Sequence, residues 1–134
     1  DSFDWKEYFN DNEKLTHIAI DENNDGKVDT TQYYDSSDKL SRIETDTTFD
    51  GNVDRWSHFR DESVLDHTAF DTTKDGKADQ WQFYNDDQTL KKAEYDTNND
   101  EKADRWEIFD SSGKLKKIQL DRNFDGKIDL SQKK

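Results

Sequence analysis

The sequence predicts an all-β fold in which tandem 25-residue β-hairpin repeats form a twisted meander or a solenoid, with Asp-rich loops along one edge. Three observations predict this fold. A nine-residue Asp-rich segment recurs five times at a constant step of 25 residues, which is the signature of a repeat array. Short aromatic and apolar runs separate these segments and are bounded by Asp, Ser, Asn and Gly, as is typical of strands and turns. No stretch between turn signals keeps a helical period for the roughly 12 residues that a helix needs.

The repeat organises the 134 residues as a single array without an insertion. The chain opens inside a unit, because Asp4 holds the last loop position and Trp5 stands one place earlier than the Trp of later units. We therefore expect the first unit to be partial. The array comprises a partial unit 1–20, four units 21–45, 46–70, 71–95 and 96–120, and a terminal half unit 121–134.

Each unit is expected to form one hairpin. In the best-kept unit, residues 103–109 and 114–120 are aromatic or apolar runs, and the turn cluster 110–113 lies between them. Phe109 and Leu115 flank this turn and are expected to close its tip.

Side-chain alternation along each strand assigns the two faces of this hairpin. Trp106 and Ile108 point to one face, and we expect Ile118 and Leu120 to join them from the second strand. Stacking at the repeat period then aligns equivalent side chains, so that each unit buries a face of its neighbour.

The composition limits the function classes. The chain has 33 Asp plus Glu against 20 Lys plus Arg, a net charge of −13, which disfavours nucleic acid and anionic lipid and favours cations as partners. Only 28% of residues are hydrophobic, but 13% are aromatic, which argues against a disordered acidic chain. The absence of Cys excludes disulfides and thiolate metal sites. No apolar run reaches the roughly 20 residues that span a membrane.

The Asp-rich segments follow the pattern D-x-[NDT]-x-D-G-x-x-D, which indicates calcium loops. Ca²⁺ takes six to eight hard oxygen ligands at about 2.3–2.6 Å, and Gly at the sixth position permits the sharp turn that brings them together. In the first complete loop the ligands are expected to be Asp21, Asn23, Asp25, the main-chain carbonyl of Lys27, and Asp29.

The same positions give a ligand set in every loop. The other predicted ligands are Asp46, Thr48, Asp50, Asn52 and Asp54; Asp71, Thr73, Asp75, Lys77 and Asp79; Asp96, Asn98, Asp100, Lys102 and Asp104; and Asp121, Asn123, Asp125, Lys127 and Asp129, with each seventh-position residue contributing its main-chain oxygen. The five loops carry formal charges of −3, −3, −1, −3 and −1, so they hold −11 of the net −13. Calcium ions would offset this charge along the loop edge.

Departures from the pattern predict which loops bind calcium more weakly. Thr48 and Thr73 replace Asn at the third position and Glu101 replaces Gly at the sixth, so these three sites are expected to be weaker. We expect at least two loops to bind calcium, foremost the first and the last. The flanking runs are strands and the twelfth position lacks a constant Glu, which argues against an EF-hand. The alternative is that Asp and Asn form Asx turns, which explains Asp at positions 1 and 5 but not at position 9.

The loop resembles the calcium loops of FG-GAP and integrin-type β-propeller repeats and, less closely, those of dockerins. The hairpin pattern W-x-x-[FY]-[DN]-x-x-[GDQ]-x-L is similar to bacterial YD (Rhs-type) and MORN-like repeats. Together, from Asp4 to Asp129, they resemble repeats of bacterial secreted proteins and surface lipoproteins. The resemblance implies calcium binding and an extracellular, periplasmic or cell-surface location.

Other residues give weaker signals. His17, His58 and His67 have no metal-ligand spacing and are expected to be solvated or half-packed. Trp56, Trp81 and Trp106 share one repeat position. We expect them to pack in the core, and the alternative is an exposed stripe that stacks on a glycan or peptide.

The regularity of the units argues against an active site, which would break the repeat. The sequence therefore predicts a non-enzymatic calcium-binding β-repeat module of a bacterial secreted or cell-surface protein that acts as a binding or spacing element. Two alternatives remain. One is a protein-interaction module for a peptide, secreted enzyme or toxin, with calcium incidental, and the other is a glycan-binding adhesin that uses the Trp stripe.

Overall fold

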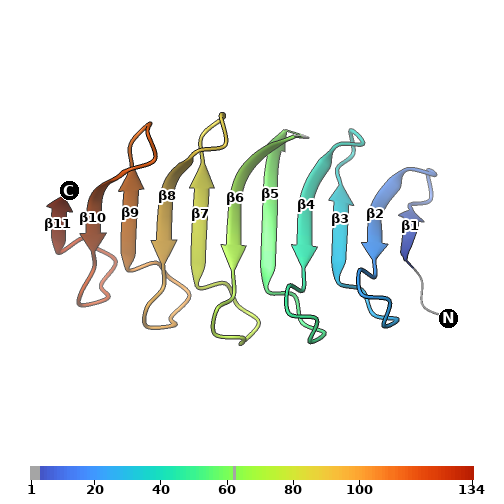
Figure 1. Ribbon diagram of the computed structural model, residues 1–134, viewed down its shortest axis with the longest axis horizontal. Helices are drawn as coiled ribbons and strands as arrows, with labels where there is room; N and C mark the ends of the chain where they lie inside the picture. The colour runs from blue at the N-terminus through green and yellow to red at the C-terminus, as the bar shows by residue number, and fades with distance from the viewer. Residues whose placement is uncertain (1–3, 62) are drawn as a thin grey trace.

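The computed structural model describes residues 4–61 and 63–134, and over these residues it is a single antiparallel sheet (Figure 1). Eleven described strands follow one another across the sheet in chain order, so the all-β prediction is confirmed as an open meander. Residues 1–3 of the predicted partial unit lie outside the described residues. The strands are β1 (Trp5–Phe9), β2 (Leu15–Ile20), β3 (Thr30–Tyr34), β4 (Leu40–Thr45), β5 (Arg55–Asp61), β6 (Val64–Phe70), β7 (Gln80–Tyr84), β8 (Leu90–Tyr95), β9 (Arg105–Phe109), β10 (Leu115–Leu120) and β11 (Leu130–Lys133).

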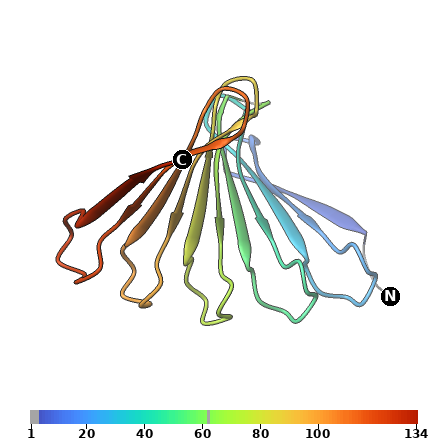
Figure 2. The same ribbon diagram turned by 60° about the vertical axis from the view of Figure 1, so that its left-hand side comes forward.

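The sheet is one layer thick and twisted. Figure 2 shows the strands fanning out progressively along the array, as expected from the inherent twist of β-sheets. The hairpin tips gather along one side of the sheet and the Asp-rich loops spread along the other (Figures 1 and 2). No second layer of the described residues covers either face.

The buried apolar core of this layer is small. Among the described residues only Ala19, Ala69 and Ala93 are buried hydrophobic side chains. Ala69 on β6 lies opposite Trp56 on β5 and Trp81 on β7, so two indole rings flank a small residue. Stability therefore depends on cross-strand side-chain pairs and on the hydrogen-bonded ladder rather than on a packed second layer.

The hairpin tips are built by their first residue. The carboxylate of Asp110 accepts hydrogen bonds from the main-chain N–H groups of Ser112 and Lys114, and its carbonyl accepts one from Gly113. Gly113 has a positive φ of 83°, which Gly adopts without strain. Asn10 and Asp35 build the same turn, because their side chains accept the equivalent main-chain hydrogen bonds.

The predicted grouping of side chains on the two faces of the last hairpin is wrong. Trp106 lies opposite Gln119, because β10 carries a bulge just after the turn and its register shifts by one residue. Ile118 and Leu120 therefore point to the face opposite to that of Trp106 and Ile108.

Phe109 and Leu115 do lie opposite each other beside the turn, as predicted.

Candidate functional site

The five Asp-rich loops connect successive hairpins and lie along the same edge of the sheet (Figure 1). They are residues 21–29, 46–54, 71–79, 96–104 and 121–129. The Asp at the first position is buried in every loop, with 2–8% of its surface exposed. The edge thus contains buried carboxylates, which require compensating hydrogen bonds.

Main-chain amides supply those hydrogen bonds to the first Asp. In the first loop the Asp21 carboxylate accepts hydrogen bonds from the N–H groups of Asp25, at 3.2 Å, and Gly26, at 2.8 Å. The sixth-position amide makes the same bond at 2.6–2.8 Å in the other four loops. Successive N–H groups that converge on a carboxylate stabilise its charge without a cation.

The ninth Asp closes the loop from the other side. The carboxylate of Asp79 accepts hydrogen bonds from the N–H groups of Thr72, at 2.8 Å, and Thr73, at 3.1 Å, and from the hydroxyl of Thr72 at 2.7 Å. Asp29 and Asp104 receive the equivalent N–H bond at 2.8 Å. This contact explains Asp at position 9, which the Asx-turn alternative alone did not. A signal for it existed in the sequence, because the second position is Thr in three of the five loops: Thr47, Thr72 and Thr97.

The third, fifth and seventh positions are exposed in all five loops. The fifth-position carboxylate accepts a hydrogen bond from the seventh-position N–H, as Asp25 does from Lys27 at 2.8 Å. This main-chain N–H holds the pKa of the fifth-position carboxyl below its usual range at Asp50 and Asp75.

The loops contain oxygen donors of the type that Ca²⁺ prefers, but the carboxylates of one loop do not converge. Over residues 4–61 and 63–134, no group of three or more Asp, Glu or His side chains is arranged to hold a metal ion. Each predicted ligand set is brought into one loop, with its acidic side chains turned toward main-chain amides. Calcium binding at these positions therefore requires the side chains of a loop to rearrange.

Neighbouring loops are also linked to one another. The Nζ of Lys74 lies 3.8 Å from the Asp50 carboxylate, and the Asn99 side-chain amide donates to Asp75 at 3.1 Å. Lys77 lies 3.5 Å from Glu101. These contacts join consecutive loops in part of the edge and offset some of its negative charge.

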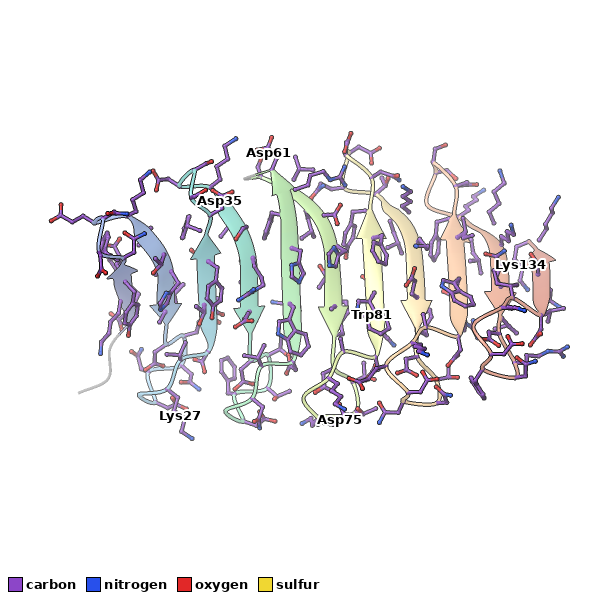
Figure 3. All side chains as sticks on the ribbon, turned by 180° about the vertical axis from the view of Figure 1, so that it is seen from behind. Lys27, Asp35, Asp61, Asp75, Trp81 and Lys134 are labelled. Atoms are coloured by element: carbon purple, nitrogen blue, oxygen red, sulfur yellow. The ribbon has the colours of Figure 1, made fainter. Side chains whose placement is uncertain are left out.

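Trp56, Trp81 and Trp106 point to one face of the sheet, on alternate strands β5, β7 and β9. Figure 3 shows Trp81 over β7, toward the loop end of the strand. All three are half-buried, so they pack against neighbouring strands and still present part of the ring to solvent.

A second row of side chains crosses the same face, two residues nearer the hairpin tips along each strand. We call it the ladder row, and cross-strand pairing makes it continuous from β1 to β11. Its members in order are Tyr8, His17, Tyr33, Arg42, His58, His67, Phe83, Lys92, Ile108, Lys117 and Lys133.

Ring contacts connect much of the ladder row. The rings of Tyr8 and His17 stack at 4.3 Å, and those of His58 and His67 stack at 4.4 Å. The His67 ring lies 5.3 Å from that of Phe83. Burial lowers the pKa of His58, and the neighbouring His67 lowers it further. All three His are half-buried, in agreement with the half-packed alternative. Sequence reasoning missed that they belong to one row.

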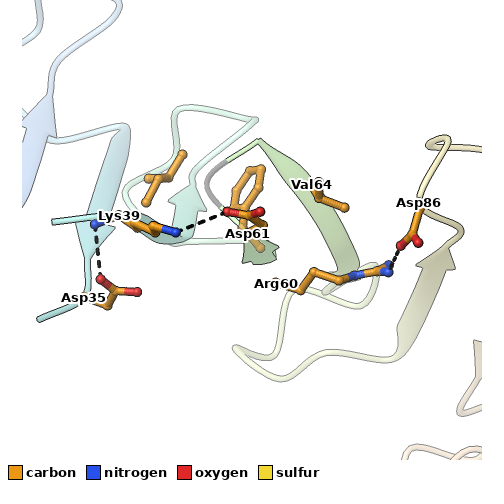
Figure 4. Close-up of a pocket in the computed structure, with 8 residues that line it drawn as sticks. Asp35, Lys39, Arg60, Asp61, Val64 and Asp86 are labelled. Atoms are coloured by element: carbon orange, nitrogen blue, oxygen red, sulfur yellow. Dashed lines mark hydrogen bonds and ion pairs between the residues drawn. The ribbon is translucent and has the colours of Figure 1, made fainter. Parts of the chain in front are cut away.

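A hollow of about 650 Å³ opens between the hairpin tips (Figure 4). Leu40, Phe59 and Val64 form its apolar part. Four of its charged groups form ion pairs, since Lys39 lies 3.7 Å from Asp61 and Arg60 contacts Asp86, whereas Asp35 accepts hydrogen bonds from main-chain N–H groups. The hollow is thus a gap between neighbouring hairpin tips, and ion pairs connect these tips across it.

The fold and the repeated edge define a tandem β-hairpin repeat protein with a single-layer sheet. No family model matches the chain, and no curated protein is similar to it. The solved structures include a similar fold in accessory secretory protein 1, 2 and 3 of Streptococcus pneumoniae, with a TM-score of 0.56 and 15% identity. The match covers 78% of this chain and 19% of that one, and it shows the fold alone. In the described part of the chain, no helix is long and apolar enough to cross a membrane.

Proposed function

We propose that the chain is a non-enzymatic repeat module of a bacterial secreted or cell-surface protein, that it acts as a binding or spacing element, and that its Asp loops bind calcium. The observation that carries the proposal is the open sheet of eleven described strands, uncovered on both faces. Ten steps of about 4.8 Å between strands give a length of about 48 Å. Such an array holds its two ends apart and offers a long surface.

Contacts between successive repeats support the spacing role. Cations of one hairpin tip reach acidic groups of the next, as Lys14 reaches Asp38 at 3.7 Å and Lys39 reaches Asp61. Several units therefore contact their neighbours at the loop edge or at the tips, as well as through the sheet. Added repeats would lengthen the module without changing its architecture.

Charge density supports calcium binding. Neighbouring loops are two strands apart, about 10 Å, which is close to the Debye length at physiological ionic strength, so their charges repel one another. The fifth-position carboxylates are exposed, and each would exchange its hydrogen bond from the seventh-position N–H for a contact with the ion. Extracellular calcium modules have dissociation constants of roughly 10⁻⁴–10⁻³ M, and an ion at tenfold its dissociation constant stabilises a site by about 1.4 kcal/mol.

Thermal unfolding followed by circular dichroism tests the calcium proposal. We expect millimolar CaCl₂ to raise the melting temperature above its value in EDTA, and MgCl₂ to raise it much less. Asp25→Asn removes an exposed fifth-position charge, and Asp35→Asn is a matched control at a hairpin tip. Only Asp25→Asn should reduce the calcium-dependent rise. Equal melting temperatures in EDTA and calcium would overturn the proposal.

A second candidate is a surface that binds a glycan or protein partner. The half-exposed rings of Trp56, Trp81 and Trp106 on an uncovered face favour it. Trp81→Ala that abolishes binding to a glycan array, at a temperature where the variant remains folded, would support it. A lower melting temperature with no change in binding would instead assign the ring to packing.

A further inference from the structure

The ladder row alternates between two kinds of side chain. On the even-numbered strands from β2 to β10, one repeat position is basic in all five units: His17, Arg42, His67, Lys92 and Lys117. On the odd-numbered strands β1 to β7 the other position is aromatic or His: Tyr8, Tyr33, His58 and Phe83. The row therefore presents a cationic or titratable group at every second strand, with ring faces between.

The charge of this row is opposite to that of the molecule. The ladder row contains no Asp or Glu, in a chain whose net charge is −13. The Arg42 guanidinium lies 4.2 Å from the centre of the Tyr33 ring, and the Lys92 ammonium lies 4.5 Å from that of Phe83. Both cations are half-buried and held in place by rings, so their positions are set before any ligand arrives.

Acidic neighbours contact three of the basic positions, and the His67 ring nitrogen Nδ1 lies 2.7 Å from the Asp66 carboxylate. Arg42 contacts Glu44 at 3.3 Å, and Lys92 contacts Glu94 at 2.5 Å, both within the same strand and on the loop side. The neighbouring Lys117 and Lys133 line a small hollow at the C-terminal end of the same row, together with Lys116 and Lys134. An anionic ligand lying along the row meets the cations Arg42, Lys92, Lys117 and Lys133, and between the first two it meets His58 and His67.

From this alternation we infer that the ladder row binds an extended acidic polysaccharide that runs across the strands. This inference rests on the proposed binding function and names its ligand. The carboxylate or sulfate groups meet the basic positions, and the sugar rings lie on the aromatic side chains. Trp56, Trp81 and Trp106 form a parallel border on the same face.

The spacing favours a polysaccharide over a peptide. Side chains of the ladder row are one strand apart, about 4.8 Å, which is similar to the length of one sugar in an extended polysaccharide. Basic positions recur every two strands, about 10 Å, and so match one acidic group per disaccharide. Side chains on one side of an extended peptide recur at about 6.7 Å and lose this register within a few strands.

Isothermal titration calorimetry with the full chain tests the inference. The probe is a hyaluronan oligosaccharide, which carries one carboxylate per disaccharide, and the control is a neutral chitin oligosaccharide of equal length. We expect the acidic probe to bind, with an affinity that falls as salt is raised, and the neutral probe to bind much more weakly. Equal binding of both probes, or no binding of hyaluronan, overturns the inference.

Two matched double variants locate the site. Arg42→Gln with Lys92→Gln removes two cations from the ladder row and should weaken binding about tenfold. Arg55→Gln with Arg105→Gln removes the same charge from the opposite face and should leave binding unchanged.

Equal losses of affinity in both double variants would show nonspecific charge attraction. Tighter binding of polyglutamate than of hyaluronan would show a peptide site. Either result overturns the inference. The calcium-dependent melting temperature is measured on the same samples, so failure of the proposed calcium function is seen separately.

Discussion

The main-chain N–H of Asp96 donates a hydrogen bond to the carbonyl oxygen of Asp79 across 2.9 Å. The first residue of one loop is therefore paired with the last residue of the loop before it. The same pairing joins Asp46 to Asp29 at 2.7 Å and recurs along the array. Each pair extends the sheet by one rung beyond its strands, which gives both Asp positions a role in the fold.

The ninth Asp should be required for stability even without a metal. Asp79→Ala leaves the amides of Thr72 and Thr73 without their carboxylate acceptor and should lower the free energy of unfolding by about 1–3 kcal/mol. Asp75→Ala, at the exposed fifth position, should cost less. Urea unfolding of both variants in EDTA measures the difference. Equal losses would contradict the role of the ninth position in closing the loop.

The sixth position requires a positive φ, and one unit meets this with a non-Gly residue. Glu101 has a φ of 71°, whereas Gly76 at the equivalent position has 86°. Glu101→Gly should stabilise the chain by about 0.5–1 kcal/mol, because the exposed ion pair with Lys77 is worth little. The reverse change, Gly76→Ala, should destabilise by about 1 kcal/mol through the backbone alone, since an added Cβ meets no atom within 4 Å. Thermal melts of both variants test the pair, and a less stable Glu101→Gly would refute the explanation.

Stability should fall between neutral pH and about pH 5. Burial and the adjacent His67 lower the folded-state pKa of His58 below its usual value of about 6.5. The unfolded chain then takes up a proton at His58 before the folded chain does, so this stability is present above about pH 6.5 and is lost as the pH falls toward the folded pKa.

His58→Tyr should abolish this contribution, because Tyr does not titrate between pH 5 and pH 8. The variant keeps an aromatic ring, as Tyr33 does at the equivalent position. Urea midpoints between pH 8 and pH 5 compare the variant with the unmodified chain. An identical pH slope in both would contradict the contribution of His58.

The Trp rings should contribute to stability as well as to the surface. Trp81 lies between Ala69 and Glu94 in its row, and its ring is half-buried. Trp81→Ala should cost about 2 kcal/mol, less than the 3–5 kcal/mol of a fully buried Trp. Trp81→Phe keeps a smaller ring and should cost less than half as much. Chemical unfolding of the two variants measures the contribution, and a neutral Trp81→Ala would assign the ring to ligand contact alone.

The repeat made most of the fold predictable. The constant step placed every hairpin, and Phe109 paired with Leu115 as expected. The assignment of side chains to the two faces of the sheet is harder to predict. One bulged residue after each turn changes which side chains of the second strand share a face with those of the first. The sequence carries no alternation signal that reveals such a bulge, so Ile118 was assigned to the wrong face.

The sequence predicts where the Asp-rich loops lie, but not which groups their carboxylates contact. The Asp pattern located the five loops correctly, yet the same residues serve as acceptors for main-chain amides. A carboxylate that closes a loop and a carboxylate that binds calcium need the same residue at the same place, so the pattern cannot separate the two roles. The ladder row was missed because His17, Arg42 and Lys92 differ in residue type and share only their charge and repeat position.

Amide chemical shifts during a calcium titration test the central claim most directly. The N–H groups of Gly26, Gly51, Gly76 and Gly126 donate to the first Asp of their loops and report on its carboxylate. If the loops bind calcium, the signals of Gly26 and Gly126 should shift and saturate at millimolar calcium and those of Gly51 and Gly76 at higher calcium, with the Gly113 signal at a hairpin tip unmoved and magnesium without effect. Glycine signals that stay unchanged at high calcium would contradict the account. The Asp loops would then be turns that connect the hairpins without binding a metal.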